Sequence, residues 1–443
     1  MVTTQFFRGT LLCLCAAVSA AATIAGCTET ANSPEPVETS TEPTEPVPQT
    51  TPEPWKVPEP EPTPTALPEP ETPVVAVNID AEPNRSNTED TLPPVPLDAA
   101  SATEFLDLRG VGDAGMTETH QQPYNLTDFL SIGATANFGA RLDIFDPTGK
   151  SYRGDLSFIN WESTIGLRCD EFWAPLNPGA FAFVSHPDNI TEVYKRGFNL
   201  IGLANNHTRD CPSADDGLDG ALVSSQHMER LSEELDANWL WHGVGEQKEA
   251  TVKTLNVKGR SVKVAFASFY LAEGDCTYVT CKFDEQTVLR SLRDADADIR
   301  ILSIHSWTAE TQKELENLGV KFLTYYNGDV VFGHGPHVWA PVRVVESPTG
   351  KRGVMFESLG NFIHPALLPK TTNLIGRVLF DLETMKLRQV QIIPIAVDRV
   401  DAYFGGTPEP SAVPANLNWQ LTSDPAWQSG VNPQVRGAYS NIQ

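Results

Sequence analysis

Residues 329–337 read DVVFGHGPH and place two histidines directly after an apolar run. The β-branched and aromatic residues Val330–Phe332 predict a buried strand, which ends at a glycine. His334 and His337 follow it in a turn that also contains glycine and proline. Imidazole is the commonest protein ligand for zinc and also suits iron, so the stretch indicates part of a metal site. A pair of structural turn histidines is the alternative.

Short apolar strands alternate with helical segments over residues 126–405, which predicts one layered α/β domain. The expected strands are 129–134, 156–160, 200–204, 251–257, 261–268, 299–304, 330–332, 353–356, 374–382 and 387–395. The expected helices are 188–196, 219–235, 284–295 and 308 to about 318. Residues 99–125 are interpreted as a lead-in to this domain, and residues 406–443 as a C-terminal extension of loop composition.

Polar side chains of metal-ligand type stand repeatedly at the ends of the expected strands. They are Asn160 and Glu162, Asn206 and His207, His305, and the two turn histidines. In open α/β sheets, sites form in the crevice outside the carboxyl ends of the strands. A shared metal-bearing cleft is therefore favoured over scattered structural polar residues.

Residues 1–27 differ from the rest of the chain. They contain one basic residue, an apolar stretch shorter than a membrane-spanning helix, and small residues that lead to Cys27. This pattern is typical of a bacterial lipoprotein export signal, in which Cys27 becomes the lipidated first residue. The rest of the chain is then expected on the outer face of the cytoplasmic membrane. An uncleaved anchor helix is the alternative and leads to the same location.

Residues 28–98 hold 18 of the chain's 35 prolines, set among Glu and Thr. They also carry 15 acidic residues against Lys56 and Arg85, a net of −13 out of the formal −25. Such a composition cannot bury enough apolar surface to offset the entropy of ordering, so we expect a disordered Pro/Glu/Thr-rich stalk. The acidic balance argues against nucleic acid as a partner.

Four cysteines remain beyond Cys27. In an oxidising exterior they allow three pairings, and we favour Cys276 with Cys281, which closes the short loop CTYVTC, and by elimination Cys169 with Cys211. A Cys₄ zinc site is disfavoured because the chain lacks a C-x-x-C pair among them.

Six motifs occur in an order that resembles the poly-γ-glutamate capsule-synthesis family, the CapA family. They are NWES (160–163), ANNHTRD (204–210), GVG (243–245), SIH (303–305), GHGPHV (333–338) and ESLGNF (357–362). The resemblance covers roughly residues 126–400. It implies similarity to the calcineurin-like metallophosphatases, whose fold is a four-layer α/β sandwich with a two-metal centre at the strand ends.

The resemblance also implies roles for single residues. The metal-site positions would be Asn160, Glu162, His305, His334 and His337. Asn206 would offer an amide oxygen, and His207 would act as general acid near the leaving group. Asn361 would orient a ligand or close the rim. For Asn361 an asparagine that only tolerates a tight turn is the alternative.

Three positions depart from the family pattern. The Gly-Asp expected after the first strand reads Gly133-Ala134, and an alanine cannot bind a metal. Ser306-Trp307 alters a His-Trp-Gly segment, and Gly335 replaces a histidine of GHHPH. The expected cofactor is thus Mn, Fe or Zn, as two ions or as one ion in a partly lost site, and an empty site remains open.

The resemblance leaves two main functions open. One is a cell-surface, metal-dependent hydrolase that acts on phosphate-bearing or polyglutamate envelope material. The other is a non-catalytic platform for binding or assembly of capsule or cell-wall polymer, and a structural wall lipoprotein is a third. The implied partners are that polymer, capsule-synthesis membrane proteins, and the membrane through the lipid anchor.

Overall fold

The structure is a computed structural model that describes residues 92–98, 102–116, 120–121, 138–172, 181–271, 276–364, 371–398, 401–405, 420–422 and 437–442. These ranges all belong to one compact unit, residues 80–443. The expected signal with Cys27, the stalk up to residue 91 and the strand expected at 129–134 lie outside the described residues. Within the described ranges, no helix has both the length and the apolar character needed to cross a membrane.

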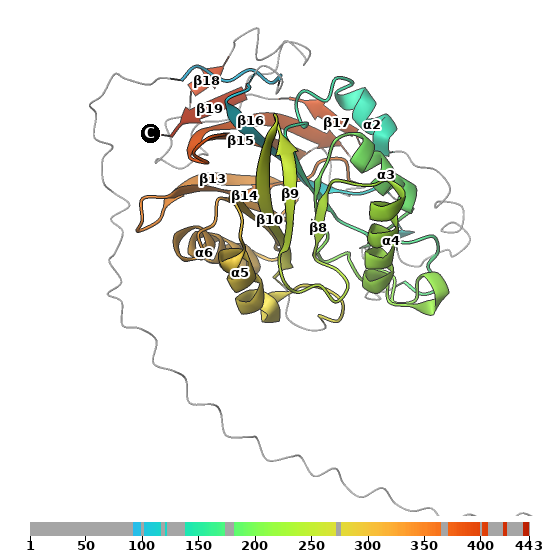
Figure 1. Ribbon diagram of the computed structural model, residues 1–443. Coiled ribbons are helices and arrows are strands. Elements are labelled where there is room, and N and C mark those ends of the chain that lie inside the picture. Colours follow the sequence, from blue (N-terminus) through green and yellow to red (C-terminus); the bar gives the residue numbers. More distant parts are fainter. Residues whose placement is uncertain are drawn as a thin grey trace, which may run out of the picture. The chain divides into compact units, whose positions relative to one another are not determined.

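The larger of the two main sheets has nine strands, and β15 to β19 are labelled on it in Figure 1. They are β1 (Phe105–Ala114), β3 (Leu156–Trp161), β7 (Leu200–Gly202), β8 (Leu240–His242), β15 (Thr371–Asp381), β16 (Leu387–Asp398), β17 (Asp401–Phe404), β18 (Gln420–Thr422) and β19 (Gly437–Asn441). Their order is β18-β19-β16-β15-β1-β3-β7-β8, and β17 pairs with β16. The half formed by β1, β3, β7 and β8 is parallel, which brings the carboxyl ends of these strands to one edge.

The smaller sheet has six strands in the order β13-β14-β12-β11-β10-β9. They are β9 (Thr251–Val257), β10 (Arg260–Tyr270), β11 (Ile299–His305), β12 (Val330–His334), β13 (Trp339–Glu346) and β14 (Arg352–Leu359). β10, β11, β12 and β14 run parallel. Two small pairs complete the strands, β2 (His120–Gln121) with β5 (Phe181–Ala182) and β4 (Thr164–Ile165) with β6 (Val184–Ser185).

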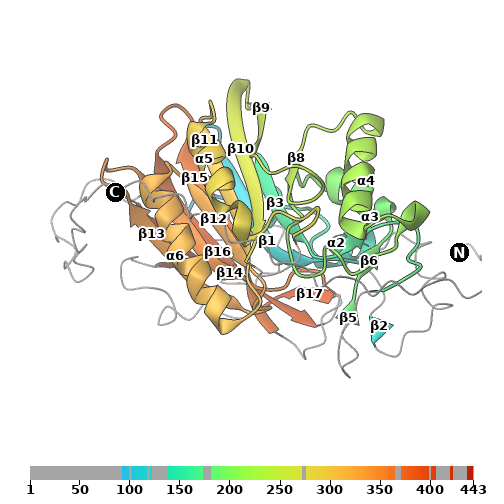
Figure 2. The ribbon, with the colours of Figure 1, turned by 90° about the horizontal axis from the view of Figure 1, so that it is seen from below.

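Helices cover the outer faces of both sheets, as Figure 2 shows from below. α2 (Phe138–Phe145), α3 (Pro187–Lys195) and α4 (Gly220–Glu234) pack on the larger sheet, and α5 (Glu285–Asp294) and α6 (Ala309–Tyr325) on the smaller one. Between the sheets, Phe158 stacks on Phe332 with 4.6 Å between ring centroids. The result is a helix–sheet–sheet–helix arrangement, which confirms the predicted layered α/β sandwich.

β1 corrects the interpretation of residues 99–125 as a lead-in, because it occupies the middle of the larger sheet between β15 and β3. Its charged residues make it look polar in sequence. Asp107 and Arg109 are fully buried in it, and Arg109 and Arg377 each place Nη2 at 2.7 Å from Asp107 Oδ2. These opposite charges satisfy one another inside the sheet, so a strand can carry them.

The same arginines bind the segment before β1. Arg377 donates to the carbonyl oxygens of Val95 and Pro96 at 2.8 and 2.9 Å, and Arg109 donates to that of Leu97 at 2.7 Å. Residues 92–98 therefore pack on the domain, and the stalk boundary expected at residue 98 is wrong. The expectation that residues 406–443 form only loops is also wrong, because β18 and β19 lie in this range and extend the larger sheet.

Candidate metal centre

The parallel strands of both sheets end at one edge, where polar side chains converge. Two groups of three each have ligand atoms that all lie within 4.8 Å of one another. The first group is Asp113, His305 and His334, and the second is Glu162, His337 and His364. The six residues come from the ends of β1, β3, β11 and β12 and from the loops after β12 and β14.

Asp113 supplies the carboxylate that the sequence interpretation assigned to position 134 and found missing. Position 134 lies outside the described residues, and the Gly-Asp pair at the centre is Gly112-Asp113 at the end of β1. A Cβ at position 112 would lie 1.8 Å from the carbonyl oxygen of Gly360, so only glycine permits this close approach. The expectation that the alanine removes a ligand is therefore wrong.

Four contacts orient the Asp113 carboxylate. Oδ1 accepts a hydrogen bond from the side-chain amide of Asn160 at 2.8 Å and lies 3.4 Å from His334 Nδ1. Oδ2 accepts one from the Gly335 N–H at 3.0 Å and lies 3.4 Å from His337 Nδ1. Burial alone would raise the pKa of Asp113. The hydrogen bonds and charges of the histidines have the larger combined effect and hold this pKa well below its usual range.

Gly335 is a turn residue rather than a lost ligand. Its φ is +113°, and a Cβ there would lie 1.7 Å from the carbonyl oxygen of Ser306. A histidine side chain has no room on this backbone, whereas the Gly335 N–H contributes directly to the centre by binding Asp113. The interpretation of Gly335 as a weakness of the site is corrected accordingly.

Glu162 is fully buried, and neither carboxylate oxygen has a hydrogen-bond partner in the described part of the chain. Its neighbours are imidazoles: His364 Nε2 at 3.3 Å from Oε2, and His305 Nε2 and His207 Nε2 at 3.7 and 3.9 Å from Oε1. Burial raises the pKa of Glu162 well above its usual value, and the charge of Asp113 acts in the same direction. A cation between these groups would remove that penalty.

The two strand-end histidines of the smaller sheet lie close together, with 2.7 Å between His305 Nδ1 and His334 Nδ1. Ser303 Oγ is 2.7 Å from His334 Nε2, so His334 presents Nδ1 to the centre. Burial lowers the pKa of His305 and of His364 well below the usual value, which keeps both rings in the neutral form that binds metals.

Buried polar atoms without a partner gather at this centre. Among the described residues they include both oxygens of Glu162, Nε2 of His305, both ring nitrogens of His364, Oδ1 of Asn206 and Nδ2 of Asn361. Buried polar groups in folded proteins are normally satisfied, so this concentration indicates a site that binds a polar or charged ligand. Carboxylate and imidazole together suit Zn, Mn and Fe, and the residues present therefore fit a divalent cation in each group.

The loop after β7 directs His207 into the centre. Asp210 Oδ2 lies 2.5 Å from His207 Nδ1 and accepts the Phe183 N–H at 2.6 Å, which leaves His207 Nε2 facing Glu162. Burial raises the pKa of Asp210, although the His207 ring opposes this. A disulfide between Cys211 and Cys169 ties the loop directly after Asp210. A second disulfide joins Cys276 to Cys281.

Several residues expected at the site have supporting positions. Asn160 donates to Asp113, and Asn361 Oδ1 lies 2.7 Å from His337 Nδ1, which orients that ring. Asn205, the neighbour of Asn206 in the motif, holds the loop, because its side chain donates to the Trp161 carbonyl at 2.9 Å. Asn206 Oδ1 remains free to contact a ligand.

Sequence reasoning missed three members of the centre: Asp113, His364 and Asp210. Each left a signal in the sequence. Asp113 follows a glycine at the end of an alternating run, His364 stands two residues after the ESLGNF motif, and Asp210 closes the ANNHTRD motif.

Residues 111–366 match the family model described as "Bacterial capsule synthesis protein PGA_cap", and this range contains both ligand groups. The capsule biosynthesis protein CapA of Bacillus anthracis is 23% identical over 253 residues, which are 54% of this chain and 56% of that protein. The chain thus spans about half the length of this curated relative.

Two solved structures are similar at 14% identity. One is a novel phosphatase from Mycoplasma pneumoniae, with a TM-score of 0.39 over 67% of this chain and 95% of that chain. The other is a hypothetical protein from Thermus thermophilus, with a TM-score of 0.36 over 66% and 99%.

Proposed function

The chain belongs to the bacterial capsule synthesis protein PGA_cap family, and on this premise we propose that it is a metal-dependent hydrolase of phosphoester bonds in capsule or cell-envelope material. The observation that carries the proposal is the pair of ligand groups at the strand ends, with unpartnered buried atoms in both. Two divalent cations held there would polarise a phosphoryl group and neutralise the charge that develops on it.

Residues of this chain would take two roles: six would be metal ligands, and one would donate a proton. Asp113, His305 and His334 would hold one cation, and Glu162, His337 and His364 would hold the other. Asn160, Ser303 and Asn361 fix the orientation of these ligands through hydrogen bonds of 2.7 to 2.8 Å.

His207 is placed to donate a proton to the leaving oxygen. Asp210 fixes its ring through Nδ1, so Nε2 is the atom that faces the centre. The free Oδ1 of Asn206 lies on the same loop and would contact a cation or the phosphoryl group.

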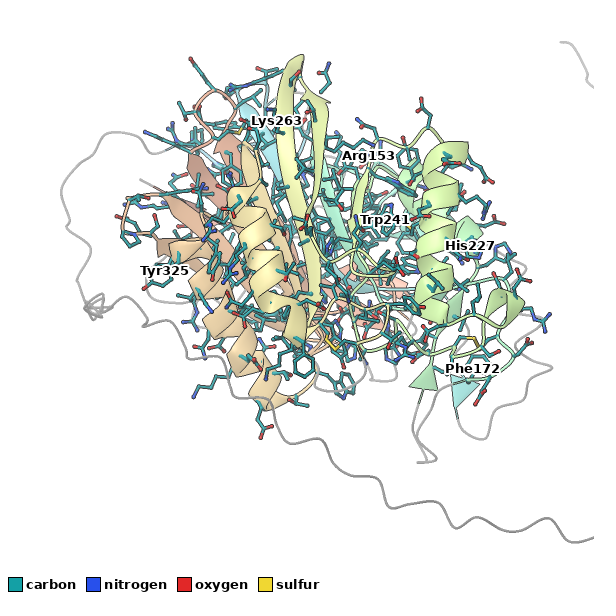
Figure 3. All side chains as sticks on the ribbon, turned by 60° about the horizontal axis from the view of Figure 1, so that its bottom comes forward. Arg153, Phe172, His227, Trp241, Lys263 and Tyr325 are labelled. Carbon is teal, nitrogen blue, oxygen red and sulfur yellow. A yellow bond between two sulfur atoms is a disulfide. The ribbon has the colours of Figure 1, made fainter. Side chains whose placement is uncertain are left out.

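The test measures metal content and turnover on the full chain. After incubation with Mn²⁺, Fe²⁺ or Zn²⁺ and removal of free metal, we expect about two ions per chain and hydrolysis of a phosphomonoester or phosphodiester. Asp113→Asn and His364→Ala should each lower both quantities. His227→Ala is the matched control, because His227 lies on α4 and bonds Asp215 rather than the centre (Figure 3).

A chain that binds metal without turnover would instead support the non-catalytic platform, which binds or assembles capsule or cell-wall polymer. A chain that binds no metal would contradict the proposal outright.

We also propose that the protein acts at the outer face of the cytoplasmic membrane, anchored through a lipid on Cys27. The pattern of residues 1–27 supports this location, and polymer such as poly-γ-glutamate and capsule-synthesis membrane proteins would be the partners there. Incorporation of a labelled fatty acid that is lost in Cys27→Ser is the expected result. Equal labelling of both chains would contradict it.

A further inference from the structure

A large aromatic side chain stands exposed at the mouth of the centre. Trp307 is 54% exposed although it follows the buried ligand His305 by two residues. Its ring centroid lies 5.4 Å from that of His337, at 74° between the ring planes. Val338, next to His337 in the sequence, is a second exposed hydrophobic residue, at 42%.

The backbone holds Trp307 in place. Its N–H donates to Thr311 Oγ1 at 3.1 Å, in the first turn of α6, and Thr308 caps that helix through a reciprocal pair of bonds with Thr311. The indole therefore stands on the end of a helix that packs on the smaller sheet. A tryptophan has only two side-chain torsions to order, so it offers a large contact surface to a second ring at low entropy cost.

Trp307 ends a row of rings that crosses the centre. His337 stacks with His364 at 5.6 Å, and Phe183 contacts His364 at 5.1 Å and His207 at 4.2 Å. The row thus runs from the proposed proton donor, past two ligands of the second group, to the exposed indole. Because this row includes two residues of the second ligand group, a phosphoester bound there would have aromatic rings nearby.

We propose that Trp307 selects phosphoesters whose organic part is a ring with an apolar face, a sugar or an aryl ring, by stacking on it. The proposal rests on the phosphoesterase function proposed above and names its substrate class. Trp307 contacts the substrate but takes no part in the proton transfer. It determines specificity through KM rather than kcat.

The test compares phenyl phosphate and a sugar 1-phosphate with methyl phosphate, using the metal-loaded full chain. Trp307→Ala should lower the ratio of kcat/KM for the ring esters over methyl phosphate by roughly 5- to 20-fold, through KM. Trp307→Phe should retain most of the ratio. Tyr325→Ala is the control, because Tyr325 is 69% exposed at the opposite end of α6 and should leave the ratio unchanged (Figure 3).

If Trp307→Ala lowers the relative kcat/KM for the sugar ester alone, the site is specific for carbohydrate. If it lowers the relative kcat/KM for phenyl phosphate alone, the site is specific for aryl groups. An unchanged ratio in Trp307→Ala, with metal content equal to that of the wild type, overturns the proposal.

If the wild-type protein shows no turnover, the proposed hydrolase function is contradicted, but the stacking role of Trp307 is not. In that case, calorimetry measures the binding of phenylphosphonate and methylphosphonate to the wild type and to Trp307→Ala, and the comparison tests the stacking role. Weaker binding of the phenyl compound alone in Trp307→Ala supports stacking, and equal binding of both compounds by the two chains overturns it.

Discussion

Asn160 on β3 donates its side-chain amide to Asp113 on the neighbouring strand β1, with 2.8 Å between Nδ2 and Oδ1. Asn160→Ala removes this donor, so the Asp113 carboxylate keeps only its contacts to the Gly335 N–H and to the histidines. Loss of such a supporting bond typically lowers metal affinity 10- to 100-fold. Titration with Zn²⁺ or Mn²⁺ against a competing chelator measures the change. Asn256→Ala, in the β9–β10 hairpin, is the matched control. Equal affinities in wild type and Asn160→Ala would show that the bond does not orient Asp113.

Asp107 neutralises two buried arginines, and its replacement should destabilise the fold. Asp107→Asn leaves Arg109 and Arg377 as buried like charges without a counter-ion, which costs about 3–5 kcal/mol. Urea unfolding of the full chain at pH 7 measures this. Asp381→Asn, at a partly exposed turn, should cost less than about 1 kcal/mol. A loss in Asp107→Asn no greater than in this control would contradict the assigned role.

His242 should make the fold sensitive to mild acid. It is fully buried, Nδ1 accepts the Ser268 N–H at 3.0 Å, and Nε2 lies 3.0 Å from the Glu249 carbonyl. Burial lowers its pKa to about 4, below the value of 6.5 that it has when unfolded. The unfolded chain therefore binds a proton more readily, so stability is full above pH 6.5 and falls as the pH drops toward 4.

The expected loss from this group is about 2 kcal/mol between pH 7 and pH 5. Unfolding curves at both pH values measure it. His242→Gln should be less stable at pH 7 but should lose about 2 kcal/mol less on acidification. A wild type and a His242→Gln variant with the same pH dependence would refute this assignment.

The disulfide between Cys169 and Cys211 should matter for activity as well as stability. Cys211 follows Asp210, which orients His207, so the bond fixes one end of that loop. The double variant Cys169→Ser, Cys211→Ser should lose about 2–4 kcal/mol of stability and part of its turnover. Cys276→Ser, Cys281→Ser opens a loop with a sequence separation of 5 and should cost less. Thermal unfolding and kcat of both variants make the comparison.

The layered fold could be predicted because most strands of the smaller sheet are plain apolar runs, such as Val330–Phe332, and because the hairpin at Lys258-Gly259 has the expected turn residues. β1 could not be recognised in the same way. Asp107 and Arg109 interrupt its apolar pattern, and their partner Arg377 lies 270 residues beyond Asp107 in the sequence. A pattern read along the chain cannot show a charge pair that forms across a sheet.

Because β1 was not recognised as a strand, the carboxylate of the metal centre was also assigned wrongly. With the strand unrecognised, Asp113 had no strand end to occupy, and Ala134 was assigned its place. His305 and His334 were recognised because they stand at the ends of apolar strands, and His337 because it lies in the turn that follows the second of these strands. His364 follows a turn, and only the folded loop brings it to 3.3 Å from Glu162.

The bonds from Arg377 and Arg109 to residues 95–97 also determine how the domain responds to mechanical load. Tension on the chain ahead of Leu92 would first meet the side chains of Asn441 and Gln389, which bond Leu92 and Pro93, and then the two arginines, which connect to Asp107 in the middle of the larger sheet. A pulling force on this segment is therefore distributed over several hydrogen bonds, which would have to break together before the segment detaches. A force applied ahead of Leu92 would therefore meet buried hydrogen bonds before it reaches β1, the strand whose carboxyl end carries Asp113.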